Sequence, residues 1–161
     1  MKYTIQGSPM PVVICELEPG EKMINEGGSM SWMSPNLSMA TNAGGFGKAI
    51  GKMFSGEKMF QNIYTAENGA GMIAFASSFP GEIVAVEITP DKPIIAQKGS
   101  FLAATEGVEL SVHFQKKLGA GFFGGEGLFK TLLTGPGKVV LQSMPASQFA
   151  AMVSTLTPSK N

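Results

Sequence analysis

The feature that most constrains the fold of this chain is a pattern of short apolar runs separated by glycine-rich turns. The pattern is clearest over Leu118–Ser143, LGAGFFGGEGLFKTLLTGPGKVVLQS, where Gly135-Pro136-Gly137 separates an apolar run over 128–134 from a β-branched run over 138–143. Runs of about six residues have the length of strands, and glycines adopt the positive φ angles that sharp turns need. The stretch therefore predicts a β-hairpin whose two strands are both largely buried.

Similar runs recur along the rest of the chain. Each is bounded by turn residues and none is long enough for a globular helix, so the sequence predicts an all-β fold. Asn68-Gly69 separates two of the runs and is the strongest short hairpin signal in the chain. The strands predicted ahead of residue 118 cover 12–17, 22–26, 29–33, 36–40, 60–66, 72–76, 82–88, 94–96, 101–103 and 108–114.

Two segments have helical spacing of their apolar residues. A short C-terminal helix is predicted over 147–156, where apolar residues recur every three or four positions and prolines stand on both sides. Gly44–Phe54 has an apolar face opposite Lys48 and Lys52. That segment predicts either a short helix packed on the sheet or an interfacial membrane helix.

Several landmarks of the chain occur twice in the same order. Gly28-Ser29 matches Gly99-Ser100 at an offset of 71 residues, and Glu57 matches Glu126 at an offset of 69. A nearly constant offset over several landmarks indicates internal duplication. We therefore expect a single domain over 1–161, built from two repeats over approximately 12–81 and 82–146.

The charge and cysteine content exclude several classes of protein. Twelve basic residues balance twelve acidic ones, whereas nucleic-acid-binding proteins are normally basic, so we expect no nucleic-acid partner. The single cysteine, Cys15, rules out an intramolecular disulfide and multi-cysteine metal sites. No apolar run has the length of a signal-peptide core or a transmembrane helix, so we expect a cytoplasmic protein.

The quoted stretches together resemble a known family. LGAGFFGGEGLFKTLLTGPGKVVLQSMP, QKGSFLAATEGVEL, LEPGEKMINEGGSMSWM and SGEKMF are similar to segments of the altered-inheritance-of-mitochondria family of uncharacterised proteins. The resemblance covers nearly the whole chain. It implies an all-β fold, a double-stranded β-helix or sandwich like that of the tryptophan RNA-binding attenuator protein (TRAP). It implies no established enzymatic activity, and family members carry three repeats where two are found here.

The candidate site residues lie at the repeat turns. Glu57 and Glu126 hold matching positions, so they could form a paired-carboxylate site for acid–base chemistry or a hard cation. Alternatively, each carboxylate accepts backbone N–H groups at the turn that enters its strand. We adopt the structural interpretation and assign the repeat turns to Gly56, Glu57, Phe60, Gly125, Glu126, Phe129, Gly135 and Gly137.

Enzyme chemistry has little support in the sequence. His113 is the only histidine, which rules out a metal site with two histidines. A Cys15–His113 dyad is conceivable, but Cys15 lies in an apolar run, where a cysteine is usually a small buried hydrophobe. We predict no catalytic residue, no metal site and no cofactor.

The sequence therefore favours a non-enzymatic oligomeric scaffold or binding module. Hydrophobic residues make up 43% of the chain and charged residues 15%, which leaves apolar surface for a partner. We expect a homo-oligomer, a dimer or a trimer, with the trimer preferred because it would form a ring of six repeats. The alternative is a peripheral membrane protein that uses the Phe/Gly-rich segments around 46–54 and 122–123.

Overall fold

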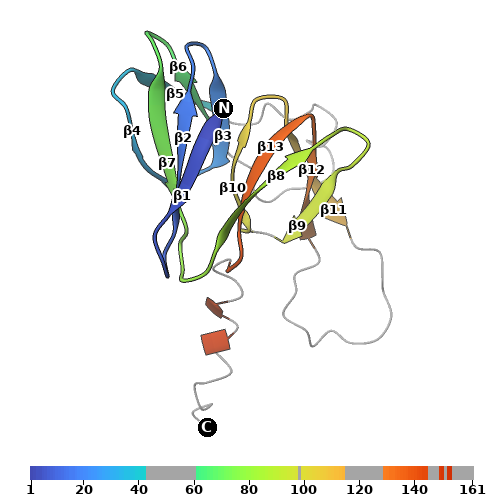
Figure 1. The fold of residues 1–161 in the computed structure, drawn as a ribbon. Coiled ribbons are helices and arrows are strands. Elements are labelled where there is room, and N and C mark those ends of the chain that lie inside the picture. Colours follow the sequence, from blue (N-terminus) through green and yellow to red (C-terminus); the bar gives the residue numbers. More distant parts are fainter. Residues whose placement is uncertain (43–60, 98, 115–128, 145–148, 151, 154–161) are drawn as a thin grey trace.

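The structure is a computed structural model that describes residues 1–42, 61–97, 99–114, 129–144, 149–150 and 152–153 (Figure 1). Within these residues it contains thirteen strands, and the pairings between them are antiparallel. The prediction of an all-β fold is thus confirmed. The strands are β1 Lys2–Gln6, β2 Val12–Leu17, β3 Lys22–Glu26, β4 Met30–Met33, β5 Leu37–Asn42, β6 Gln61–Ala66, β7 Gly71–Ala76, β8 Ile83–Ile88, β9 Ile94–Gln97, β10 Phe101–Thr105, β11 Glu109–Phe114, β12 Phe129–Thr134 and β13 Gly137–Gln142.

The strands form three sheets. The four-stranded sheet has the order β1-β2-β7-β4, the six-stranded sheet β5-β6-β3-β10-β13-β8, and the three-stranded sheet β11-β12-β9. The pairing of β3 with β10 joins strands from the two halves of the chain into one continuous sheet. In Figure 1 the first seven strands occupy one side of the molecule and the last six the other.

Two apolar cores lie on opposite faces of the six-stranded sheet. Val139 and Val140 are consecutive in β13 and fully buried, yet they belong to different cores, because neighbouring side chains of a strand point to opposite faces. The first core packs that sheet against the four-stranded sheet, where the rings of Tyr64 and Phe75 meet edge to face at 6.0 Å. The second core packs it against Leu110 and other residues of the three-stranded sheet. The six-stranded sheet is thus the central layer.

The first strand of the structure was not predicted. β1 pairs with β2 along its whole length, from Lys2 opposite Glu16 to Gln6 opposite Val12. Each of its five residues is exposed, so it has little apolar signal. Its position is fixed instead by pairing with the edge of a strongly apolar strand.

The two hairpin predictions are wrong. β12 pairs with β11 and β9, whereas β13 pairs with β10 and β8, so Gly135-Pro136-Gly137 connects strands of two different sheets. Asn68-Gly69 likewise connects β6 of the six-stranded sheet to β7 of the four-stranded sheet. Turn residues specify a sharp reversal of the chain, but the partner of each strand is set by burial against distant segments. Both turns are corners between layers.

The two helical predictions fall largely outside the described residues. Gly44–Phe54 lies wholly outside them. Of the C-terminal segment 147–156, the structure describes only 149–150 and 152–153, which have helical backbone and are too few to test a helix. Phe149 stacks on Phe79 at a centroid distance of 4.6 Å, which brings this segment against the end of the β structure.

Candidate functional site

The strand pairings of the N-terminal half recur in the C-terminal half. β7 lies between β2 and β4, and β13 lies between β8 and β10; β6 lies between β5 and β3, and β12 lies between β11 and β9. The register recurs as well, including a bulge at the same place. The corresponding pairs are Met30–Phe75, Trp32–Ala74 and Met33–Ile73 in one half, and Phe101–Leu141, Ala103–Val140 and Ala104–Val139 in the other.

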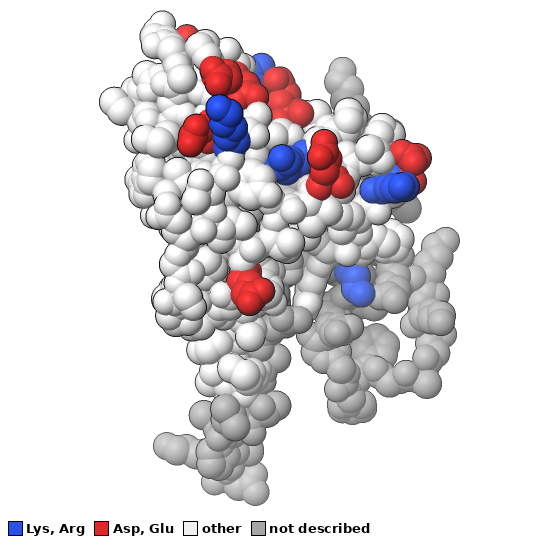
Figure 2. All heavy atoms as spheres, in the orientation of Figure 1, with Lys and Arg blue, Asp and Glu red and all other residues white. Residues whose placement is uncertain are grey.

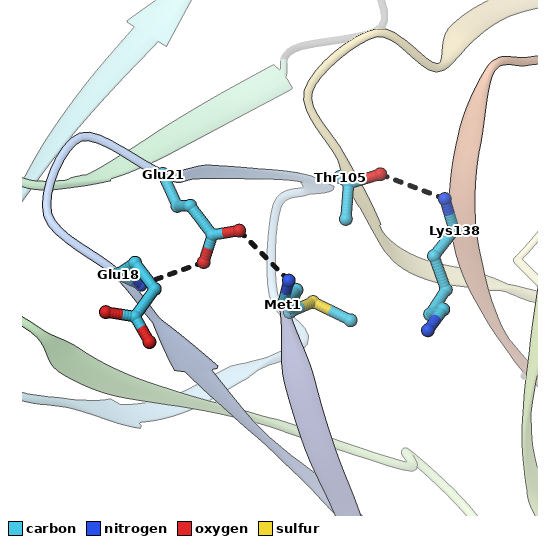
Figure 3. Close-up of polar contacts among 5 residues, drawn as sticks. All are labelled: Met1, Glu18, Glu21, Thr105 and Lys138. Atoms are coloured by element: carbon cyan, nitrogen blue, oxygen red, sulfur yellow. Dashed lines mark hydrogen bonds and ion pairs between the residues drawn. The ribbon is translucent and has the colours of Figure 1, made fainter.

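A hydrogen bond at the corners recurs in the same way. The hydroxyl of Ser34 accepts from the backbone N–H of Met72 at 2.9 Å. The hydroxyl of Thr105 accepts from the backbone N–H of Lys138 at the same distance (Figure 3). Both bonds fix the end of a bulged strand to the start of the strand with which it pairs, so the same hydrogen bond holds the corner in each half.

The two halves meet at a seam formed by β3 and β10. Ile24 lies opposite Ala104 and Met23 opposite Thr105, and the N–H of Glu106 donates to the carbonyl of Lys22 at 3.3 Å. The ammonium of Lys22 pairs with the carboxylate of Glu106 at 2.9 Å, but both side chains are well exposed. Exposed ion pairs contribute only about 0–1 kcal/mol, so the seam depends mainly on the ladder and the apolar residues it buries.

Two strands that correspond to the seam strands have one partner each in the described part of the chain. β9 corresponds to β3 but pairs only with β12, and β4 corresponds to β10 but pairs only with β7. Ile95 holds the place of Ile24, and it is 48% exposed where Ile24 is 8% exposed. Trp32 holds the place of Ala103, and it is 42% exposed where Ala103 is fully buried. The free edges thus expose apolar positions that the seam buries.

A groove of about 420 Å³ lies beside the seam and contains the chain's N-terminus. The ammonium of Met1 donates to Glu21 Oε1 at 2.9 Å, and the backbone N–H of Glu18 donates to Glu21 Oε2 at 2.8 Å (Figure 3). The bond from Glu18 and then the ammonium lower the pKa of Glu21. Both carboxylate oxygens of Glu21 accept hydrogen bonds from within the chain. We therefore assign this carboxylate a structural role, in which it holds the N-terminus in the groove. The remaining lining comes from Leu17, Pro19, Gly20, Lys22, Thr105 and Glu106.

A buried amide that the sequence analysis missed connects three segments of the chain. Gln142, at the end of β13, is 7% exposed. Its Oε1 accepts from the N–H of Ser78 at 3.0 Å, and its Nε2 donates to the carbonyl of Gly99 at 2.7 Å. The only available signal was a glutamine inside an apolar strand, which suggests a buried polar contact without naming its partners.

The predicted turn residues are only partly covered by the structure. Gly56, Glu57, Phe60, Gly125 and Glu126 lie outside the described residues, so neither interpretation of the paired glutamates is tested.

The predicted turn residues that are described stand at strand ends. Phe129 begins β12, opposite Phe114 in the ladder. Gly135 is buried at the corner, where a Cβ would contact the carbonyl oxygen of Ile88, and Gly137 begins β13 with a φ of 155°. These two glycines are required by close approach and backbone conformation.

The candidate dyad is not brought together. Cys15 lies in β2 of the four-stranded sheet, whereas His113 lies in β11 of the three-stranded sheet. Cys15 is fully buried, and burial raises the pKa of its thiol to about 12. It is the small buried hydrophobe that its apolar surroundings predicted. The described residues contain no group of three acidic, histidine or cysteine side chains placed to hold a metal ion.

The surface in Figure 2 has acidic and basic side chains side by side, with a broad uncharged area beside them. No large patch of one sign is visible on this face. Among the described residues no helix has the length and apolar character needed to cross a membrane. Within the part of the chain that the structure describes, the strand edges with a single partner are the features that expose apolar side chains for contact.

The fold and these edges define an all-β protein of three antiparallel sheets whose two halves share one pairing scheme. The chain belongs to the mitochondrial biogenesis AIM24 family, whose model matches residues 3–151, so the family resemblance is confirmed.

Two relatives from Streptococcus pyogenes are similar to this chain. An uncharacterised protein of serotype M6 is 33% identical over 153 residues, which covers 89% of this chain and 60% of the relative. The crystal structure of another S. pyogenes protein has a TM-score of 0.67 and 30% identity, over 89% of this chain and 64% of that one. This chain therefore spans less than two thirds of the length of each.

Proposed function

We propose that this chain is a non-enzymatic scaffold or binding module that works as a homo-oligomer. The observation that carries the proposal is the difference in burial between matching positions, since Ile95 is 48% exposed and Ile24 only 8%. Edge strands with exposed apolar side chains favour pairing with another chain. The distance in the fold between Cys15 and His113 adds support, because it leaves the one candidate dyad without its base.

We also infer that the module consists of two repeats within one domain, over approximately 12–81 and 82–146. The recurring registers, the recurring bulge and the recurring Ser34 and Thr105 hydrogen bonds support this inference. Each repeat has one strand that corresponds to β3 and one that corresponds to β10, and among the described residues only β3 and β10 themselves pair across the repeats. In the described part of the chain, β9 and β4 are therefore the two edges of these kinds that stay without a second partner strand.

Multi-angle light scattering tests the oligomer. A ring of three chains would have a mass of about 51 kDa, three times the 16.9 kDa of one chain, and a dimer twice that of one chain. We expect a single species of one of these masses at micromolar concentration. A monodisperse species at the mass of one chain, up to about 100 μM, would contradict the proposal, because it would leave less than about 5.5 kcal/mol of favourable association free energy.

A peripheral membrane role is the second candidate. It rests on the Phe/Gly-rich segments around 46–54 and 122–123, and on the description of the family as one of mitochondrial biogenesis. Sedimentation with vesicles of neutral and of anionic lipids distinguishes the two candidates, because an aqueous scaffold stays in the supernatant with both. We propose the cytoplasm as the compartment, where a lone thiol is typical, and cell fractionation tests it.

A further inference from the structure

Resting on the proposed assembly, we propose where and in which register the copies join. The β9 edge of one copy pairs antiparallel with the β4 edge of the next copy. Ile95 of the first copy lies opposite Met33 of the second, and Ile94 lies opposite Ser34. The partner is thus a second copy of this chain, bound head to tail.

The internal seam supplies the template for this register. In the seam, Ile24 lies opposite Ala104 and Met23 opposite Thr105. β9 follows β3 at an offset of 71 residues, as judged from their pairing: Ile24 lies opposite Ile63 in β6, and Ile95 lies opposite Leu132 in β12. β4 precedes β10 by the same offset, as the shared bulge indicates. Adding 71 to the residue numbers of β3 and subtracting 71 from those of β10 converts the seam pairs into their counterparts. Ile24–Ala104 becomes Ile95–Met33, and Met23–Thr105 becomes Ile94–Ser34.

The burial of matching residues favours this junction over other free edges. At the seam, Ile24 is 8% exposed and Ala104 is fully buried. At the open edges, Ile95 is 48% exposed, Met33 is half-buried, and Trp32 is 42% exposed. Joining the edges removes apolar surface from water on both copies at once, which is the main source of favourable free energy in association. The backbone groups of the edge gain partners in the same step.

Two prolines limit how far the new ladder extends. Pro93 holds the place of Lys22 and Pro35 that of Glu106, the residues that form the last hydrogen bond and the ion pair of the seam. A proline has no N–H to donate, and it is tolerated at the end of an edge strand. The junction between copies therefore lacks both interactions, so it is weaker than the seam and reversible. Only the two central pairs and the apolar contacts remain.

The junction is heterologous because it joins two different edges. Heterologous contacts form closed rings when the rotation closes and open chains when it does not. Each copy carries one edge of each kind, so every copy in a ring makes the same two contacts. The expected trimer of six repeats is the closed form.

Cysteine cross-linking in solution tests the register. Met33→Cys and Ile95→Cys are made separately, and the native Cys15 does not interfere because it is fully buried with a thiol pKa of about 12. Residues directly opposite in an antiparallel pair lie about 4.5–5.5 Å apart at Cα, within the range of a disulfide. We expect a dimeric disulfide when the two variants are mixed and oxidised, and little when either is oxidised alone. The double variant forms higher multimers.

Restoring the missing contacts gives a second test that does not depend on disulfides. Pro93→Lys with Pro35→Glu returns the backbone donor and the ion pair of the seam to the junction. We expect the dissociation constant of the assembly to fall roughly three- to tenfold, measured by sedimentation equilibrium, with each single change giving less. Pro93→Lys with Pro35→Lys is the control, because it removes both prolines but places like charges opposite each other, so it should tighten the assembly less than the Lys–Glu pair does.

The outcomes separate this inference from the proposed function. If light scattering gives an oligomer but the mixed variants form no disulfide and the proline variants do not tighten it, the register is wrong while the oligomeric scaffold stands. Self-linking of Ile95→Cys alone would indicate a symmetric contact between two β9 edges and would also overturn the register. A monomer at all concentrations overturns both.

Discussion

Gln142 is the most informative single position for the stability of the fold. Its side-chain amide joins the end of β13 to the chain after β7 and to the turn before β10, through bonds to Ser78 and Gly99. These contacts span 64 and 43 residues along the sequence. The hydroxyl of Ser77 also lies 3.1 Å from Oε1 as a third donor. The substitution Gln142→Ala removes all three bonds and leaves the chain fold otherwise unchanged, so its cost measures how strongly this amide holds the two halves together.

The expected cost follows from the burial of the partners. A hydrogen bond contributes about 1 kcal/mol net, and an abandoned partner that stays dry costs about 1–3 kcal/mol. Ser78 is exposed and Gly99 is half-buried, so water can reach both groups after the change. The hydroxyl of Ser77 keeps the carbonyl of Phe79 as an acceptor at 2.7 Å, so the loss of its contact with Gln142 adds little. The lower figure therefore applies to the bonds from Ser78 and to Gly99, and their sum is about 2 kcal/mol. For a chain of this size, such a loss lowers the melting temperature by about 4–8 °C.

Urea denaturation of wild type, Gln142→Ala and Gln142→Met measures this cost. The methionine variant keeps most of the side-chain volume and loses the hydrogen bonds of the amide, so it separates hydrogen bonding from packing. Ser143→Ala is a matched control, because Ser143 accepts one exposed hydrogen bond, from the N–H of Glu82. If Gln142→Met changes the free energy of unfolding by no more than Ser143→Ala does, the linking role assigned to the amide is wrong.

Three further perturbations test other contacts. Gly135→Ala should lower the free energy of unfolding, measured in urea, by about 1–3 kcal/mol, because the new Cβ would press on the carbonyl oxygen of Ile88. Gly27→Ala is the control and should be nearly neutral, because the space around Gly27 is open. Equal effects of the two substitutions would contradict this reasoning. Glu21 has a lowered pKa, so its stabilising effect is full at neutral pH and is lost as the pH falls from 4.5 through the folded-state pKa. The stability gap between wild type and Glu21→Gln should therefore close in acid, and a gap independent of pH would refute the pairing. Cys15 should react with a thiol reagent at pH 8 only in denaturant, and rapid native labelling would contradict its burial.

The positions of the strands could be predicted from the sequence, but their partners could not. Apolar runs bounded by turn residues located strands such as Val12–Leu17 and Ile83–Ile88, because burial of a strand requires apolar side chains at the positions that face the core. The sequence predicts a hairpin at Asn68-Gly69 and another at Gly135-Pro136-Gly137. Both are corners, since a turn signal is local and carries no information about which layer the next strand joins. β1 was missed because its residues are all exposed.

The candidate site was harder to predict than the fold. The buried state of Cys15 followed from its apolar neighbours, and the structure confirms it. The open edges did not follow, because an edge is defined by the partner that a strand lacks, which only the complete topology reveals. Gln142 was invisible for a related reason: its partners lie far away in the sequence.

The two halves differ most at the residues that the seam uses. The backbone register is the same in both, yet Lys22 and Glu106 at the seam correspond to Pro93 and Pro35 at the open edges. Proline at the end of an edge strand removes a donor that would extend pairing, which is a recognised way to limit uncontrolled association. The apolar residues beside these prolines are nevertheless retained and exposed, as Ile95 shows. An edge that keeps its apolar surface but loses its terminal hydrogen bond is suited to a junction that forms and separates, whereas the seam is suited to permanent contact.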